Sequence, residues 1–266
     1  MIKIIFIVLF ITVQAGFSQS KLNVVVADKM GAIALTADVF VGADNSGFYY
    51  YIKNNVLFKQ KEAQIWQYQN VSLGTISKVD LINSLKIVVF YESFNSVVML
   101  DNQLNEISVI DFSNLPDLIA VRNTGMSGQN SLWIFNTINQ QLGLFNYETR
   151  LYKNLNQPLQ AAIKWYQTDF NNFRWIDDQL NVKQMDVFGK LDNLGTVTDF
   201  DYFQFIQESK DIVWCFNNKL YFKKNNTNQT IEIDSGEKRI INFYYHDKIL
   251  LIFTGAELVS FNLILP

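Results

Sequence analysis

The sequence is poor in residues that build common catalytic and metal sites. It has one cysteine, Cys215, one histidine, His246, and three prolines among 266 residues. A single cysteine excludes a disulfide within the chain, and one cysteine with one histidine cannot supply the usual ligands of a zinc site. A serine or cysteine nucleophile would need His246 as its base, but His246 falls at a predicted turn between two strands. Cys215 lies between two aromatic residues, where a small buried side chain is expected.

Nucleotide-binding and nucleophile-elbow motifs are also missing. The patterns GxGxxG, GxxxxGK[ST] and GxSxG do not occur. The segment richest in glycine and serine, residues 123–131, does not precede a predicted helix, so we expect an extended, mobile loop on one face of the fold and not a phosphate cradle. The chain carries 22 basic and 25 acidic residues, a net charge of −3, with no basic run or visible basic face. Nucleic acid is therefore not an expected partner, and no cofactor or metal ion is expected.

Carboxylate pairs are the remaining candidates for catalysis. Asp177 and Asp178 lie in a predicted hairpin turn, and Asp199 and Asp201 alternate so that both would point to one face of a strand. A glycosidase needs two carboxyl groups at a fixed separation across a cleft. Aspartate is also an ordinary turn residue, and we favour that interpretation.

Two other stretches have a functional and a structural interpretation. "GADNSG" contains Asp44 and Asn45 but lacks the frame of a calcium loop, so it predicts a turn. Phe170 and Trp175 could stack on sugar rings, but strand aromatics usually fill interior space, and we expect these two in the core.

A recurring hairpin dominates the chain. Four to six residues rich in β-branched and aromatic types precede a short turn of Asn, Asp, Gly, Ser or Gln, and a second such run follows. Copies begin at residues 38, 86, 131, 172, 211 and 248, which lie 48, 45, 41, 39 and 37 residues apart. Further strand-like segments flank the hairpins, and aromatics make up 15% of the chain. No long helical pattern follows the first 20 residues.

A strand-only repeat near forty residues is typical of propeller blades. We predict an all-β fold, a β-propeller of six blades with four antiparallel strands each. The last blade supplies only three strands before Pro266, so we expect residues 21–28 to pair with residues 257–265 and close the ring. A five- or seven-bladed propeller and another β architecture, such as a sandwich, are the alternatives.

The N-terminus has the layout of a secretory signal. Lys3 precedes an apolar stretch from Ile4 to Val13, and small residues follow, with Gly16 and Ser18 at the −3 and −1 positions. We predict a signal peptide over residues 1–18, cleaved between Ser18 and Gln19, and a single domain over residues 19–266. The apolar stretch is about half the length of a membrane span. The alternative interpretation is a buried first strand or helix.

The signal, with its "FSQS" junction, and the blade-like repeats resemble small exported envelope proteins of the Bacteroidota, a group whose outer-membrane machines include the type IX secretion and gliding apparatus. The resemblance implies a periplasmic protein, with secretion as the alternative, whose partners are other envelope proteins, and it transfers no site residues. We expect a non-enzymatic scaffold for protein–protein interaction within a cell-envelope complex. The alternative is a propeller that binds or cleaves polysaccharide at the mouth of its central channel.

Overall fold

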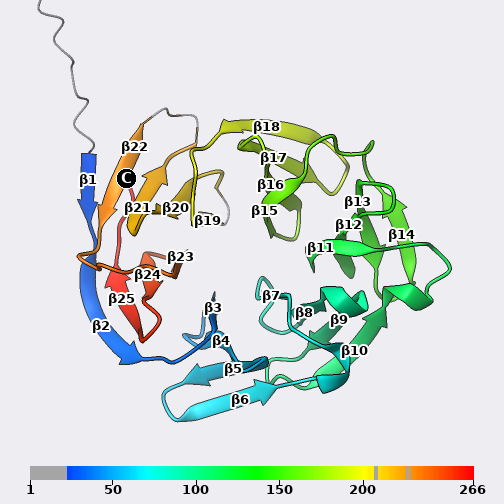
Figure 1. The fold of residues 1–266 in the computed structure, drawn as a ribbon, viewed down its shortest axis with the longest axis horizontal. Coiled ribbons are helices and arrows are strands. Elements are labelled where there is room, and N and C mark those ends of the chain that lie inside the picture. The colour runs from blue at the N-terminus through cyan, green and yellow to red at the C-terminus, as the bar shows by residue number, and fades with distance from the viewer. Residues whose placement is uncertain (1–22, 207–208, 226, 228) are drawn as a thin grey trace, which may run out of the picture.

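A computed structural model describes residues 23–206, 209–225, 227 and 229–266 of the chain. The predicted signal segment and its cleavage site at Ser18 and Gln19 lie outside these residues. The described chain forms 25 β-strands and three short 3-10 helices, η1 (Val71–Leu73), η2 (Glu92–Phe94) and η3 (Phe112–Asn114). Six sheets stand around one axis (Figure 1), and the fold is a six-bladed β-propeller, as the repeat predicts.

Each blade is an antiparallel meander whose first strand lies nearest the axis. Blade 1 holds β3 (Val39–Ala43), β4 (Tyr49–Lys53), β5 (Val56–Lys61) and β6 (Gln64–Tyr68). Blade 2 holds β7 (Lys78–Asp80), β8 (Ile87–Tyr91), β9 (Ser96–Leu100) and β10 (Glu106–Asp111). Blade 3 holds β11 (Val121–Met126), β12 (Ser131–Asn136), β13 (Gln141–Asn146) and β14 (Leu151–Asn154). Blade 4 holds β15 (Ile163–Thr168), β16 (Asn172–Asp177), β17 (Asn181–Asp186) and β18 (Leu191–Thr196). Blade 5 holds β19 (Tyr202–Phe205), β20 (Ile212–Phe216), β21 (Lys219–Lys223) and β22 (Thr230–Asp234).

Blade 6 is completed from the N-terminus, as predicted, but by a later segment than expected. Its own strands are β23 (Asn242–His246), β24 (Ile249–Phe253) and β25 (Glu257–Asn262), and β2 (Asp28–Ala34) pairs antiparallel with β25. The expected segment, residues 21–28, instead supplies β1 (Asn23–Val26), which adds to blade 5 as a fifth strand parallel to β22. The N-terminal segment thus runs along the outside of two neighbouring blades (Figure 1). Both outer edges need covering, and a single extended segment covers both.

The repeat is more regular in space than the hairpin starts suggest. In blades 2 to 6 the recurring hairpin identified in the sequence joins the second and third strands of the blade. The copy that begins at residue 38 instead joins β3 and β4, the first and second strands of blade 1. Successive second strands are 38, 44, 41, 40 and 37 residues apart, beginning at Tyr49, Ile87, Ser131, Asn172, Ile212 and Ile249. Aligning the first blade by its second strand removes the interval of 48 residues, and all five intervals then lie between 37 and 44 residues.

Tight turns explain why these sequences form hairpins. Two consecutive residues with positive φ close four of them, the signature of a type I′ turn, whose twist matches that of the strands. These pairs are Asn54–Asn55, Gln129–Asn130, Asn217–Asn218 and Asp247–Lys248. Elsewhere an aspartate accepts the backbone N–H groups two and four residues ahead, as at Asp44, Asp101, Asp177 and Asp186. Turn chemistry therefore accounts for most of the asparagine and aspartate pattern.

Each junction between blades has its own apolar core, and the junctions are unequal. Fourteen buried residues fill the junction between blades 5 and 6, including Phe243, Leu250 and Phe261. Only five fill the junction between blades 6 and 1, with Phe40 and Phe253 at its centre. Blade 6 is therefore packed firmly against blade 5 and thinly against blade 1.

Candidate functional site

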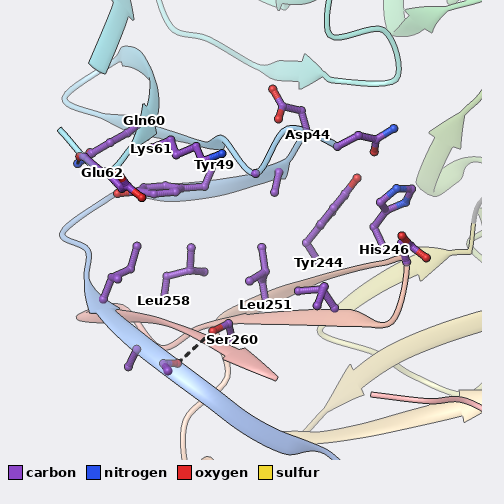
Figure 2. Close-up of a pocket in the computed structure, with 18 of the residues that line it drawn as sticks. Asp44, Tyr49, Gln60, Lys61, Glu62, Tyr244, His246, Leu251, Leu258 and Ser260 are labelled. Atoms are coloured by element: carbon purple, nitrogen blue, oxygen red, sulfur yellow. Dashed lines mark hydrogen bonds between the residues drawn. The ribbon is translucent and has the colours of Figure 1, made fainter. Parts of the chain in front are cut away.

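A groove of about 910 Å³ separates blade 6 from blade 1, at the junction with the smallest apolar core (Figure 2). It extends from the inner strand β23 to the outer strand β2, and the β3–β4 and β5–β6 turns form its opposite side. This volume lies within the range of small-molecule sites, about 300–1,000 Å³. The thin packing at this junction is what leaves the space open.

Small side chains on β2, the strand that completes blade 6, leave space along the blade 6 wall of the groove. β2 contributes Gly31, Ala32, Ile33 and Ala34, and a Cβ added at Gly31 would meet only the Ser260 hydroxyl oxygen, 3.9 Å away. The Ser260 Oγ donates to the carbonyl oxygen of Gly31 at 3.3 Å (Figure 2). Leu251 and Leu258 continue this wall toward the axis. These residues form the apolar floor of the groove, and the small side chains of β2 leave space above it.

Aromatic and amide groups form the blade 1 wall. Tyr49 stacks on Tyr51, which stacks on Phe58, with ring centroids 6.0 Å and 5.0 Å apart. The Tyr51 hydroxyl donates to Gln60 Oε1 at 3.0 Å, and the Lys61 ammonium donates to the Ser46 carbonyl oxygen at 2.7 Å. These contacts hold the outer rim of this wall in place.

The inner end of the groove is polar. Tyr244 and His246 project from β23 with their rings 6.3 Å apart, and Asp44 and Asp247 lie nearby on the two blades (Figure 2). Burial raises the pKa of Tyr244 to about 12, so its hydroxyl stays protonated well into the alkaline range. The Tyr244 ring also packs against Gly42, whose φ is +154°, and a Cβ there would lie 3.1 Å from it.

His246 is therefore in the groove, but no catalytic set surrounds it. Among the described residues, its ring has no hydrogen-bond partner, and no serine or cysteine hydrogen-bonds to it. Asp44 is engaged by the N–H groups of Ser46 and Phe48 and by the Tyr50 hydroxyl. Asp44 and Asn45 form a turn, as predicted. The groove offers polar anchoring groups at both ends of an apolar floor.

The carboxylate pairs do not form two-carboxyl sites. The Asp177 carboxylate caps its own turn through Asn181 and lies 3.1 Å from the Lys183 ammonium, while Asp178 is exposed. Burial alone would raise the pKa of Asp177, but these hydrogen bonds outweigh it and lower the pKa. Asp199 and Asp201 precede β19 and have separate partners, Lys164 and the backbone N–H of Asn217. The predicted shared strand face for this second pair is wrong, because the strand begins at Tyr202.

The other singled-out residues are structural. Cys215 is fully buried, and burial raises the pKa of its thiol to about 11. Trp175 is in the core as expected, whereas Phe170 is 40% exposed. Residues 123–131 are not the expected loop: they form the end of β11, a tight turn and the start of β12. Gly125 in this strand lies where blades 2, 3 and 4 meet, since a Cβ there would lie 2.0 Å from the Thr168 hydroxyl and 2.5 Å from Asp80 Oδ2.

The structure shows two charged features that the sequence did not reveal, a buried lysine and a lysine-lined groove. Lys59 is buried between blades 1 and 2, 3.6 Å from Asp44, with its ammonium over the rings of Phe48 and Tyr50. Four lysines from three segments of the chain also line a groove between blades 4 and 5. Thus the fold assembles a lysine-rich groove that the sequence did not indicate.

In the described part of the chain, no cluster of three or more His, Cys, Asp and Glu residues could hold a metal ion. No helix there is long and apolar enough to span a membrane.

Comparison with solved structures finds the same architecture in proteins of different function. Virginiamycin B lyase from Staphylococcus aureus matches with a TM-score of 0.55 and 12% identity, over 85% of this chain and 80% of that chain. The β-propeller domain of Cps50 (Swd1) from Myceliophteria thermophila matches with a TM-score of 0.59 and 9% identity, over 90% and 100%. The extracellular domain of the one-component system BT4673 from B. thetaiotaomicron matches with a TM-score of 0.52 and 12% identity, over 89% and 39%.

Family models give no match to the sequence, and neither does any curated protein sequence. At identities this low, the solved structures share the fold alone, and that fold is compatible with protein binding. One match is a lyase and another a domain of a propeller protein named without an activity, so the fold does not decide between catalysis and binding.

Proposed function

We propose that this chain is a non-enzymatic, exported propeller that holds an extended segment of a partner protein in the groove between blades 6 and 1. The single observation that carries the proposal is the groove itself, which is about 910 Å³ in volume and has an apolar floor with hydrogen-bonding groups at both ends. Such a floor accepts alternate apolar side chains of an extended segment, while Gln60 and Tyr49 at one end and Tyr244 and His246 at the other can bind its polar groups.

The surroundings favour binding over catalysis. In the part of the chain that the structure describes, no serine or cysteine hydrogen-bonds to His246, and the candidate carboxylate pairs have separate structural partners. A propeller also offers broad faces beside the groove, and a specific interface buries roughly 1,600 Å² in total. The N-terminal signal layout supports placing this role in the periplasm, among other proteins of an outer-membrane complex such as the type IX secretion or gliding apparatus.

A second candidate, a saccharide site at the ring axis, has one observation in its favour. Trp165, Tyr166 and Tyr202 lie together near the axis, with the Lys78 ammonium 4.2 Å from the Tyr166 ring centroid and 5.6 Å from that of Trp165. However, Asp80 is the carboxylate beside them, and it already accepts from Ile82, Met126 and Thr168. That arrangement suits sugar stacking better than cleavage, which needs two carboxyl groups.

Co-purification from the native envelope in mild detergent tests the proposal. Ala32→Trp should fill the groove and lose the partner that the wild type retains, while Val24→Trp, on the same N-terminal segment outside the groove, should retain it. Recovery of the wild type as a free monomer, or equal recovery of the partner with both variants, would contradict the proposal.

A further inference from the structure

A second groove, of about 720 Å³, lies between blades 4 and 5 and has a different chemistry. Among the described residues, its lining includes one carboxylate, that of Asp192, and four lysines, which come from three places in the chain: Lys190, Lys210, Lys223 and Lys224. The lining is therefore strongly positive in a protein whose net charge is −3. We propose that this groove binds a soluble ligand that carries two or more phosphate groups, such as a phosphorylated saccharide.

Among the described lining residues, Asp192 can offset only one of the four lysine charges. Asp192 shares its two oxygens between Lys190, at 3.2 Å, and Lys210, at 3.8 Å. Lys224 donates to the Pro266 oxygen at 3.4 Å, and Asp211, outside the lining, accepts from the N–H of Asn225 at 2.7 Å. Like charges held together in one groove repel one another, and a multiply charged anion relieves that repulsion.

The backbone of β18 leaves room beside these lysines. β17 and β18 slip register so that Lys183 faces Asn193 and Val182 faces Gly195, which leaves Leu194 as a bulge. Gly195 has φ +101°, and a Cβ there would meet nothing within 4 Å. Bulges of this kind redirect side chains and let a ligand approach the backbone.

The lining also indicates which anions fit. Ammonium groups act as point charges that bind phosphate oxygens from several directions, and the hydroxyl and amide groups of Thr196 and Asn193 suit sugar hydroxyls. None of the described lining residues is aromatic, so a nucleobase would have no ring to stack on. Four lysines against one aspartate among the described lining residues favour a ligand with several negative charges.

Isothermal titration of the purified chain with inorganic tripolyphosphate tests the proposal. Tripolyphosphate should bind at one site, at least tenfold more tightly than orthophosphate, and the affinity should fall as salt increases. Lys210→Gln with Lys223→Gln should weaken binding at least tenfold. The control, Lys153→Gln with Lys238→Gln, makes the same charge change on exposed residues elsewhere and should leave the affinity within twofold.

Asp192→Asn should tighten binding, because it removes the competing carboxylate without altering the shape of the groove. Equal loss in the two double variants would reduce the effect to net charge and overturn the proposal. Binding to phosphatidylglycerol vesicles without binding to tripolyphosphate would also overturn it, in favour of a membrane surface. Because the groove lies away from blades 6 and 1, these results are independent of the proposed protein-binding role.

Discussion

The side-chain amide of Gln204 binds both backbone groups of Tyr245 in the next blade. Its Nε2 donates to the carbonyl oxygen at 2.7 Å, and its Oε1 accepts from the N–H at 2.8 Å. Gln167 binds Phe205 in the same way one blade earlier, with both distances 2.9 Å. Glutamine here continues the hydrogen bonding from one inner strand to the next and so links neighbouring blades.

Removing this bridge should cost substantial stability. Gln204→Ala leaves a buried N–H and a buried carbonyl of Tyr245 without partners, at about 1–3 kcal/mol for each group. We expect a loss of about 2–4 kcal/mol in the free energy of unfolding, measured by urea denaturation with an unchanged m-value. Gln160→Ala, on an exposed glutamine, should change it by less than about 0.5 kcal/mol. Similar midpoints for the two variants would refute this role.

Removing only one partner of the buried ion pair between Lys59 and Asp44 should strongly destabilise the protein. Lys59→Ala leaves the Asp44 carboxylate without its cation and empties the space beneath Phe48 and Tyr50, for a loss of about 3–5 kcal/mol. Lys59→Met combined with Asp44→Asn should recover most of that loss, because neither charge remains.

Thermal melting of both variants checks this, with Lys153→Ala, on an exposed lysine of blade 3, as the control. A double variant no more stable than Lys59→Ala alone would contradict the charge argument.

The N-terminal segment should have two separable contributions to stability. A chain beginning at Ala27 loses β1, whose Val25 packs against the junction of blades 5 and 6, and should still fold with a loss of about 1–3 kcal/mol, or several degrees in melting temperature. A chain beginning at Leu35 also loses β2 and leaves β25 as an open edge, so we expect no cooperative unfolding. A chain beginning at Asn23 is the control. Similar melting temperatures for all three would mean that the ring does not depend on this closure.

Alkaline pH should destabilise the protein through Cys215. Burial raises the pKa of its thiol from 9.0 to about 11. The folded state therefore holds this proton more tightly than the unfolded state, so the contribution is full below pH 9 and is lost as pH rises toward 11.

Between pH 8 and pH 10.5 the wild type should lose about 1–2 kcal/mol more than Cys215→Ala, as measured by urea unfolding at both pH values. Buried tyrosines contribute to the alkaline loss in both proteins and cancel in the comparison. Parallel losses would show that the thiol is not buried as described.

The sequence was sufficient to predict the architecture because local signals repeat along it. Alternating strands and turn residues specify each hairpin, and the spacing near forty residues specifies the blades. The identity of the closing strand was predicted only approximately: "NVVV" has stronger strand character than "DKMGAIA", yet β2 takes the edge of blade 6. Pairing with neighbouring strands of the ring, and not intrinsic strand propensity, therefore determined which segment completes blade 6.

The two grooves could not be predicted, because each is formed by residues that lie far apart in the sequence. The first depends on small residues of β2 lying opposite Tyr49 and Gln60 in blade 1. The second depends on lysines up to 34 residues apart that separate strands bring together. Burial of Lys59 could not be predicted either, because only the packing of blade 2 against blade 1 buries it.

Site-specific photo-crosslinking in the native cell tests the proposed role most directly. Replacing Ser260, on the groove wall, with p-benzoylphenylalanine should give an adduct with one envelope protein. Replacing Phe188, which is 89% exposed on blade 4, should not give that adduct. The account predicts that Ala32→Trp abolishes the Ser260 adduct. Absence of any adduct from Ser260, or the same adduct from both positions, would contradict the claim that a partner occupies the groove between blades 6 and 1.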